Sequence, residues 1–263
     1  MISARERWLN HAILVVFAVI ALFPMIGVVA TALSLPDADP GVFADAWREG
    51  HFALYLRNSL IVSTVTVVAG TLLSITAGYA LGALRFRGSG PLFLLFLAGL
   101  TIPTEAVVVP LYFDLRSAGL DNTYAGVILP QTAQSVAFGA FWMRAYFRGV
   151  PRSLLEAARM DGASSWTTLW RVLVPMGRPA ILTMVVLTSM WTWNEFLLPL
   201  VILNADDGVR TAPLGLSFFQ GGHQTDYALL MAGALIIAAP IVAVYLFLQR
   251  HFIAGMLSGA IKE

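Results

Sequence analysis

Residues 12–33 read AILVVFAVIALFPMIGVVATAL, a stretch of 22 residues that contains no charged side chain. An α-helix rises about 1.5 Å per residue, so a stretch of this length can cross the ~30 Å hydrocarbon core of a bilayer. Arg5 and Arg7 precede the stretch and imitate a secretory signal, but a signal core has only about 7 to 15 residues. We therefore expect an uncleaved first membrane span.

Five further stretches share this length and this low charge. They cover residues 58–84, 89–113, 122–143, 179–203 and 227–249. Three carry no charge, whereas 89–113 contains Glu105 and 179–203 contains Glu195. Backbone amides cannot stay unpaired in lipid, and the ~10-residue alternation of an outer-membrane barrel is missing. The sequence therefore predicts an all-α membrane protein, one transmembrane domain over residues 1–263 with six helices. Prolines inside several of these stretches predict kinks.

The rest of the composition excludes several classes of site. Only 12% of the residues are charged, against about a quarter in soluble domains, and the net charge of +1 carries no nucleic-acid signature. Cysteine is absent and the four histidines lack metal-ligand spacing, so we expect no metal, catalytic or cofactor site. The only lysine, Lys262, excludes a Gly-x-x-x-x-Gly-Lys phosphate loop, so this chain cannot hydrolyse ATP by that chemistry.

The distribution of Lys and Arg predicts the orientation. Twelve of the sixteen fall on the side that holds the N-terminus, and the other side has four: Arg48, Arg57, Arg116 and Arg210. Cytoplasmic loops carry the excess of Lys and Arg, so both termini should be cytoplasmic. Within the second span, Ser74, Gly78 and Gly82 form a stripe of small residues that predicts ordinary close packing between helices.

The 144–178 segment is the one long cytoplasmic connection and holds six arginines. Ser153 can cap a short helix through Met160, with Glu156 as the capping-box partner. Asp161 and Gly162 should end that helix, because glycine accepts a left-handed conformation.

A second short helix is predicted from about Ser164 to Val174, ending at Pro175. Its apolar residues recur at helical spacing and form one face: Trp166, Leu169, Trp170 and Leu173. This pattern alone allows two interpretations, a lid packed under the chain's own helices or a docking element for a partner.

The same segment resembles the signature loop of the permeases of binding-protein-dependent ABC importers. Glu156-Ala157-Ala158, then Gly162, then Val172-x-Val174-Pro175 keep the family's spacing, with valines in place of isoleucine and leucine. The resemblance implies a type I importer permease fold and a loop that docks on the ATPase. The implied ATPase-coupling residues are Glu156, Ala157, Ala158, Asp161, Gly162 and Pro175.

Other segments are similar to the carbohydrate branch of that family, to the smaller permease of maltose and glycerol-3-phosphate importers. Examples are Asn58-Ser59-Leu60, Tyr79-Ala80-Leu81, Ile102-Pro103 and Trp193-Asn194-Glu195-Phe196. The resemblance implies a multi-pass protein of a prokaryotic plasma (inner) membrane that imports a sugar. Its implied partners are a second permease (a heterodimer), a dimer of ATP-binding subunits that carry ATP and Mg²⁺, an external solute-binding protein and membrane lipid.

Glu105 and Glu195 need water or a partner, because a carboxylate at mid-membrane costs about 2.5 to 3.5 kcal/mol. Two interpretations stay open for both. In one they line the translocation path, with Trp191, Trp193 and Asn194 offering stacking faces and hydrogen bonds for a sugar; in the other they reach interfacial water at kinked helix ends. The 204–226 loop is a probe into the binding protein or a solvated connector. An ion-coupled secondary carrier and a membrane scaffold are the competing functions, but no inverted repeat supports the carrier.

Overall fold

The computed structural model describes residues 4–34, 41–203, 207–220 and 226–260. Its regular elements are helices, which confirms the predicted all-α class. The long ones are α1 (Ala4–Ser34), α3 (Phe52–Ala83), α4 (Ser89–Thr101), α5 (Thr104–Ser117), α6 (Tyr124–Arg148), α10 (Arg178–Asn194) and α13 (Tyr227–Ala260). The shorter ones are α2 (Val42–Glu49), α7 (Arg152–Met160), α8 (Ser165–Thr167), a π-helix η1 (Thr168–Leu173), α9 (Val174–Met176), α11 (Leu197–Ile202), η2 (Asp207–Val209), α12 (Ala212–Gly215) and η3 (Leu216–Phe219).

Four helical segments among the described residues are long and apolar enough to cross a membrane. They are Arg5–Leu33, Phe52–Ala83, Arg178–Ile202 and Tyr227–Phe247. The bent pair α4 and α5 adds a fifth if it is counted as one span. The count of six spans and the cytoplasmic termini therefore stay predictions.

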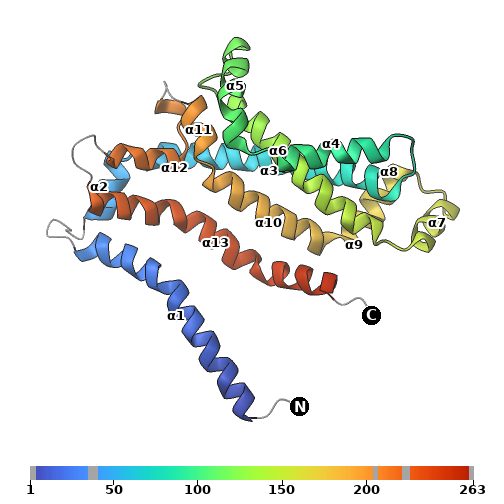
Figure 1. Cartoon of the computed structure of the whole chain (residues 1–263), viewed down its shortest axis with the longest axis horizontal. Coiled ribbons are helices and arrows are strands. Elements are labelled where there is room, and N and C mark those ends of the chain that lie inside the picture. Colours follow the sequence, from blue (N-terminus) through green and yellow to red (C-terminus); the bar gives the residue numbers. More distant parts are fainter. Residues whose placement is uncertain (1–3, 35–40, 204–206, 221–225, 261–263) are drawn as a thin grey trace. The chain divides into compact units, whose positions relative to one another are not determined.

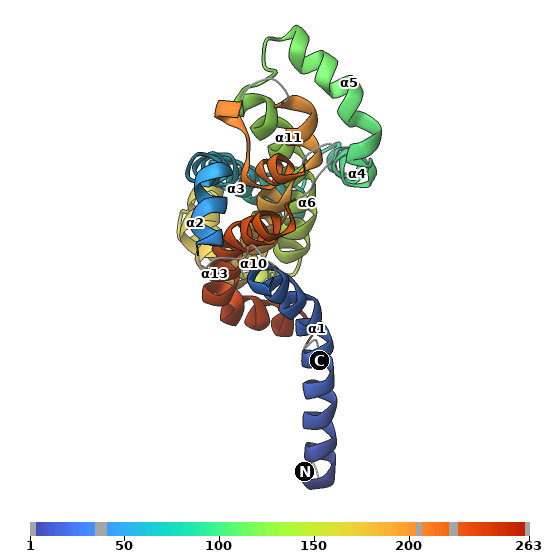
Figure 2. The ribbon, with the colours of Figure 1, turned by 90° about the vertical axis from the view of Figure 1, so that its left-hand side faces the viewer.

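The predicted single span 89–113 is two helices. The chain turns by 97° between α4 and α5, a change of direction that Figure 2 shows plainly. Ile102 is extended and Pro103 precedes the first residue of α5, because proline restricts the residue before it to extended backbone and cannot continue a helix. The predicted kink lies at this proline, and α5 continues to Ser117, beyond the predicted end.

The chain divides into two compact units, residues 1–54 with 215–239 and residues 55–214 with 240–263. In the first unit, Phe52 is fully buried and its ring lies 6.1 Å from that of Phe219. A Cβ on Gly233 would meet the Phe52 ring at 2.8 Å, so this glycine makes room for the ring. The most apolar part of α1 has none of its residues buried inside the chain, as expected of a helix whose surroundings are lipid or another subunit.

The second unit has a close helix pair at its centre, α3 and α6. A Cβ on Gly78 would collide with Met143, and one on Gly82 would lie 2.9 Å from the carbonyl oxygen of Arg144. Ser74 faces Gly139 in the same way. The predicted packing role of the small-residue stripe is therefore confirmed, and its partner is α6.

Two apolar clusters fill the second unit, one towards each end of these helices. The first joins the ends of α5 and α11 to the beginning of α6, through Val108, Leu115, Val127, Leu198 and Ile202. The second joins α3, α6 and α10 to the π-helix, through Ile75, Tyr79, Phe147, Leu173 and Met184. Figure 1 shows α5 and α11 at one end of this unit and α7 with α8 at the other.

Candidate functional site: a docking loop and a pocket between two helix breaks

The 144–178 loop begins with the helix α7, which starts earlier than predicted. Its N-cap is Pro151 and no side chain caps it, so the predicted Ser153 cap with Glu156 as capping-box partner is wrong. Proline is well suited to a helix start because its missing N–H is not needed there. The predicted end is confirmed: α7 stops at Met160 and Gly162 has φ +76°.

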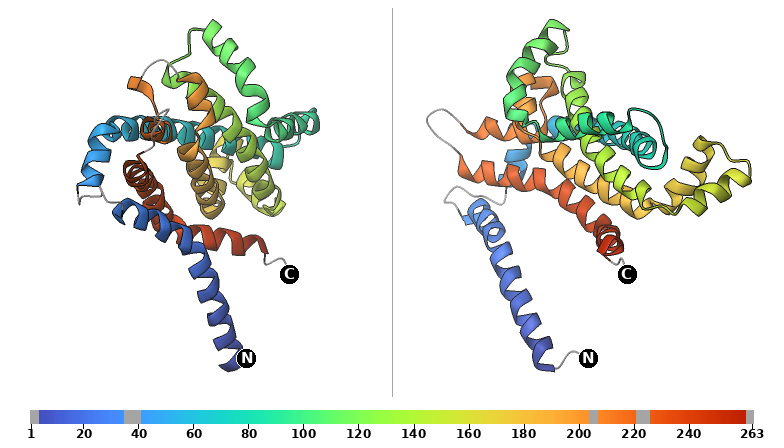
Figure 3. Two further views of the ribbon diagram at one scale, coloured as in Figure 1. Left: turned by 60° about the vertical axis from the view of Figure 1, so that its left-hand side comes forward. Right: turned by 45° about the vertical axis from the view of Figure 1, so that its right-hand side comes forward.

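The ATPase-coupling residues implied by the resemblance lie mostly on the surface of α7 and its turn. Glu156, Ala157, Asp161 and Gly162 are exposed, whereas Ala158 is buried with 8% of its surface exposed. Met160 is 87% exposed. Figure 3 shows α7 beyond the ends of α6 and α10, where its Leu154 and Leu155 pack against the second apolar cluster. This exposure leaves the loop free to contact another protein.

The second helix of the loop begins where predicted, and its N-cap is Ser164, whose hydroxyl accepts a 3.2 Å hydrogen bond from the Thr167 backbone N–H. Its continuation is a π-helix, Thr168–Leu173, and this was not predicted. Pro175 does not end the helix, contrary to the prediction; helical backbone continues to Met176 and resumes at Arg178. The wider π-turn ahead of the proline keeps the chain helical where an α-turn would clash with its ring.

The apolar face of this helix has a buried part, as predicted for a lid under the chain's own helices, and an exposed part, as predicted for a docking element. Leu169 and Leu173 are 1% and 0% exposed and pack in the core. Trp166 is 64% exposed and lies edge-on to Trp170, with ring centroids 5.5 Å apart. This face therefore packs against the chain's own helices through Leu169 and Leu173, whereas Trp166 is exposed on it.

Tyr146 holds the π-helix to α6. Its hydroxyl donates a 3.1 Å hydrogen bond to the carbonyl oxygen of Leu173. A Cβ on Gly177 would lie 2.7 Å from the Tyr146 ring, so only glycine fits at this place. Burial raises the pKa of Tyr146, and the phenol therefore keeps its proton and continues to donate.

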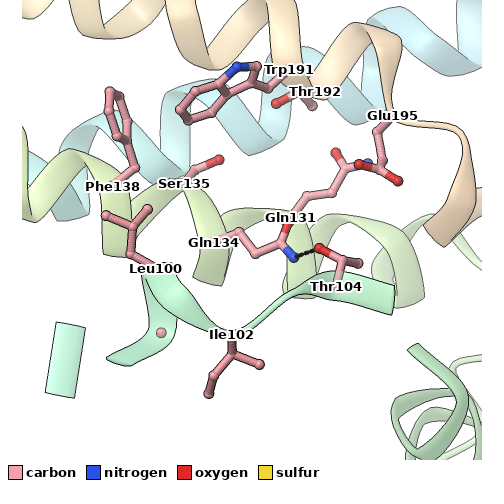
Figure 4. Close-up of a pocket in the computed structure, with 11 residues that line it drawn as sticks. Leu100, Ile102, Thr104, Gln131, Gln134, Ser135, Phe138, Trp191, Thr192 and Glu195 are labelled. Atoms are coloured by element: carbon pink, nitrogen blue, oxygen red, sulfur yellow. Dashed lines mark hydrogen bonds between the residues drawn. The ribbon is translucent and has the colours of Figure 1, made fainter. Parts of the chain in front are cut away.

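At the other end of the second unit, a pocket of about 180 Å³ lies between α4, α5, α6 and α10. Figure 4 shows its polar side chains converging from these helices. Its lining residues are Gly99, Leu100, Ile102, Thr104, Gln131, Gln134, Ser135, Phe138, Trp191, Thr192 and Glu195. The Gln134 amide donates a 2.7 Å hydrogen bond to the Thr104 hydroxyl, which joins α6 to the first residue of α5.

The four predicted path residues are separated by the structure. Trp191 and Glu195 line the pocket. Trp193 is 5% exposed and lines an apolar groove with Pro240 instead. Asn194 is exposed, and its side chain donates to the carbonyl oxygen of Met190. Glu195 follows the end of α10 in extended backbone, and its Oε1 accepts a 3.0 Å hydrogen bond from the Leu198 N–H.

Sequence reasoning missed the α6 residues of this pocket, chiefly Gln131, Gln134 and Ser135. Their signal was polar side chains in the charge-free stretch 122–143, three or four positions apart and hence on one helix face. Glu105 is exposed in the first turn of α5 and is not among the lining residues. Within the described part of the chain, no three His, Cys, Asp or Glu side chains are grouped to hold a metal ion.

The 204–226 loop, which is predicted to be external, is described only in part. Residues 204–206 and 221–225, among them Asp206, Gly221, Gly222 and Gln224, lie outside the described residues. Residues 207–219 contain the short helices η2, α12 and η3, and both predicted roles, a probe and a solvated connector, stay open. The side chain of Asn58 donates hydrogen bonds to the carbonyl oxygens of Gly208 and Arg210, and its Oδ1 accepts one from Tyr124. Residues 208–210 are therefore fixed to the beginnings of α3 and α6.

Comparison with known proteins places these features in a family. Residues 70–258 match the model of the binding-protein-dependent transport system inner membrane component. The probable ABC transporter permease protein YurM of Bacillus subtilis is 38% identical over 230 residues, 87% of this chain and 76% of that protein. The diacetylchitobiose uptake system permease protein NgcG of Streptomyces coelicolor is 33% identical over 95% of this chain and 87% of its own length.

The fold also matches a solved structure. A chain of a bacterial ABC transporter involved in the import of the acidic polysaccharide alginate superposes with a TM-score of 0.80 at 23% identity, over 96% of this chain and 99% of that one.

Proposed function

Because this chain belongs to the family of binding-protein-dependent transport system inner membrane components, we propose how it works within an importer. The chain is a multi-pass permease subunit of an ABC importer and not itself an enzyme. We propose that it forms half of the translocation path for a sugar, beside a second permease, and that its 144–178 loop receives the movement of a separate pair of ATPase subunits. An external solute-binding protein would deliver the sugar.

The exposed surface of α7 and its turn is the observation that supports the coupling role. Glu156, Asp161 and Gly162 face away from the chain's own core, while Leu169 and Leu173 just beyond them are buried in it. A movement of the exposed residues would therefore be transmitted to the buried leucines over only a few positions of the chain. Met160 at the end of α7 and Trp166 in α8 are exposed as well, and large apolar side chains of this kind anchor protein interfaces.

The sugar substrate is supported by relatives and by the pocket. NgcG is a permease of a diacetylchitobiose uptake system. The pocket offers amides, hydroxyls and a carboxylate beside an aromatic wall, which suits a hydroxylated ligand. We include Trp191 and Glu195 in the path, with Trp193 and Asn194 as neighbours that support the end of α10.

One experiment tests the coupling role, with a matched control. The chain is purified with its partner permease and ATPase subunits, and ATP hydrolysis is measured with loaded binding protein. Gly162 and Gly119 both have positive φ, open space at the Cβ position, and an N–H that donates at 3.0 Å to a carbonyl three residues earlier. Proline removes that donor and fixes φ near −65° at either place.

Gly162→Pro should abolish the stimulation of ATP hydrolysis, because it distorts the docking surface. Gly119→Pro imposes the same backbone change after α5 and should keep most of the stimulation. Equal loss in both variants would mean that the effect is general destabilisation, and full stimulation in Gly162→Pro would contradict the coupling role. Uptake by this chain alone, driven by a proton or sodium gradient, would contradict the importer mechanism.

A further inference from the structure

Two breaks in helical backbone face the same pocket. Ile102 and Thr104 line it from the break between α4 and α5, and Glu195 lines it from the break between α10 and α11. Both breaks lie inside predicted membrane spans. Irregular backbone at membrane depth occurs only where it is buried in protein or lines a polar cavity. The position of both breaks at one cavity therefore points to a polar site rather than to a packing defect.

Gln131 is the strongest sign that this cavity takes a ligand. It is only 4% exposed, and neither its Oε1 nor its Nε2 has a hydrogen-bond partner among the residues that the structure describes. A buried polar atom left without a partner costs about 1 to 3 kcal/mol. The amide presents one donor group and one acceptor, so its natural complement is a group that both accepts and donates, as a hydroxyl does. Figure 4 shows the side chain directed into the pocket from α6.

Glu195 restricts the charge of that ligand. Its Oε1 is fixed by the Leu198 N–H, and the remaining lone pairs of the carboxylate can only accept hydrogen bonds. Glu195 is the one ionisable side chain among the residues that line the pocket. An acidic sugar would place a second negative charge beside it without a cation in the lining, and like charges in one site repel.

Trp191 and Phe138 supply the apolar side of the pocket. Trp191 is 53% exposed, and Phe138 holds it edge-on with ring centroids 4.7 Å apart. An aromatic face held in this way suits the C–H face of a sugar ring. The cavity, about 180 Å³, is far larger than the ~10–15 Å³ that one water needs and smaller than the ~300–1,000 Å³ of drug-sized sites. It has room for one ring of a longer sugar.

We propose that this pocket is a subsite for one ring of an uncharged sugar, in which Gln131 and Glu195 bind hydroxyl groups and Glu195 disfavours acidic sugars. The proposal deepens the proposed function and rests on it. It assigns to this chain a part in substrate selection that is separate from the choice made by the binding protein.

The test measures sugar binding to the complete membrane complex without binding protein, so that selection by the latter does not enter. Tritiated N,N′-diacetylchitobiose is the uncharged probe and tritiated digalacturonate the acidic one, each at equilibrium with the complex in nanodiscs. Gln131→Leu should weaken binding of the uncharged probe about tenfold or more. Thr132→Val is the matched control: it also removes a buried, unpartnered polar atom of α6, but Thr132 does not line the pocket.

Glu195→Gln provides a second, independent measurement, which tests the proposal even if the complex with Gln131→Leu does not assemble. Glutamine keeps an oxygen for the Leu198 N–H and removes the charge, so binding of the acidic probe should rise several-fold relative to the uncharged one. An unchanged ratio, or equal losses in Gln131→Leu and Thr132→Val, overturns the subsite. Wild-type complex that binds the uncharged probe but shows no ATP hydrolysis in response to loaded binding protein contradicts the proposed function instead.

Discussion

The side-chain amide of Asn58 donates a 2.8 Å hydrogen bond to the carbonyl oxygen of Arg210, 152 residues further along the chain. Asn58 is fully buried, and it also binds Gly208 and Tyr124. The neighbouring Ser59 hydroxyl accepts a 2.8 Å hydrogen bond from the Ala212 N–H. Two adjacent polar residues on α3 therefore satisfy backbone groups of residues 208–212 and the side-chain hydroxyl of Tyr124 on α6.

Asn58→Leu should detach the 207–212 segment from α3. The substitution removes the hydrogen-bond partner of two backbone carbonyls and of the Tyr124 hydroxyl. Each of these groups that stays buried without a new partner costs about 1 to 3 kcal/mol of folding free energy. We expect a lower Tm in detergent and faster proteolytic cleavage in this segment. Thr76→Ala on the same helix is the control, because the hydrogen bonds of the Thr76 hydroxyl among the described residues go to carbonyls of its own helix. Equal proteolysis in both variants would count against the anchoring role.

Gly78→Val should be among the most damaging single changes in the second unit. The added side chain collides with Met143 and its backbone, which α6 cannot move without opening the whole interface. Expression as a folded, monodisperse protein should be lost or the Tm strongly reduced. Gly90→Ala, where no atom lies within 4 Å of the added Cβ, should change the Tm by at most a few degrees.

Trp166→Ala and Leu169→Ala should have opposite consequences although they lie three residues apart. Trp166 is exposed, so its removal should leave the stability of the permease unchanged and weaken its binding to the ATPase subunits about tenfold or more. Leu169 is buried, so its truncation should cost about 2 to 5 kcal/mol of folding stability. Pull-down of the ATPase and thermal unfolding, measured for each variant, separate the two effects. Unchanged ATPase affinity in Trp166→Ala would remove this residue from the docking surface.

Tyr146 should make the stability of the permease sensitive to alkaline pH. Its pKa is raised in the folded protein by burial, so its stabilising effect is complete below the unfolded pKa of about 10 and is lost as pH rises through the folded pKa. The Tm of the wild type should therefore fall more steeply above pH 10 than that of Tyr146→Phe. Parallel pH profiles for the two proteins would contradict this contribution.

The sequence predicts those parts of the fold that depend on local rules. Charge-free length indicates long membrane helices, Gly162 indicates the left-handed turn after α7, and the small residues around Gly78 indicate the tight contact of α3. The π-helix before Pro175 and the sharpness of the turn at Pro103 could not be predicted from such local rules. Both depend on which neighbours are available to satisfy the backbone, and that is a property of the packed structure.

The candidate site was predictable only in part for the same reason. Trp191 and Glu195 stand out in an apolar stretch, but Trp193, two residues away, belongs to another surface because α10 turns by about 100° per residue. Gln131 carries no motif and becomes conspicuous only once its amide is seen without a partner. All polar residues of a predicted span are therefore candidates for the lining of a site, including those that belong to no motif.

Helical residues follow one another from Ser165 to Asn194 with one interruption, at Gly177. Of this element, α10 makes up 17 residues, which corresponds to ~26 Å at ~1.5 Å per residue. Trp166 lies at one end of this element, and Glu195 follows the other. In the proposed importer, a displacement at Trp166 would reach Glu195, beside the pocket, along this one stretch of chain. Gly177 interrupts the stretch, so the rigidity of the backbone at that residue would set how much of the displacement arrives.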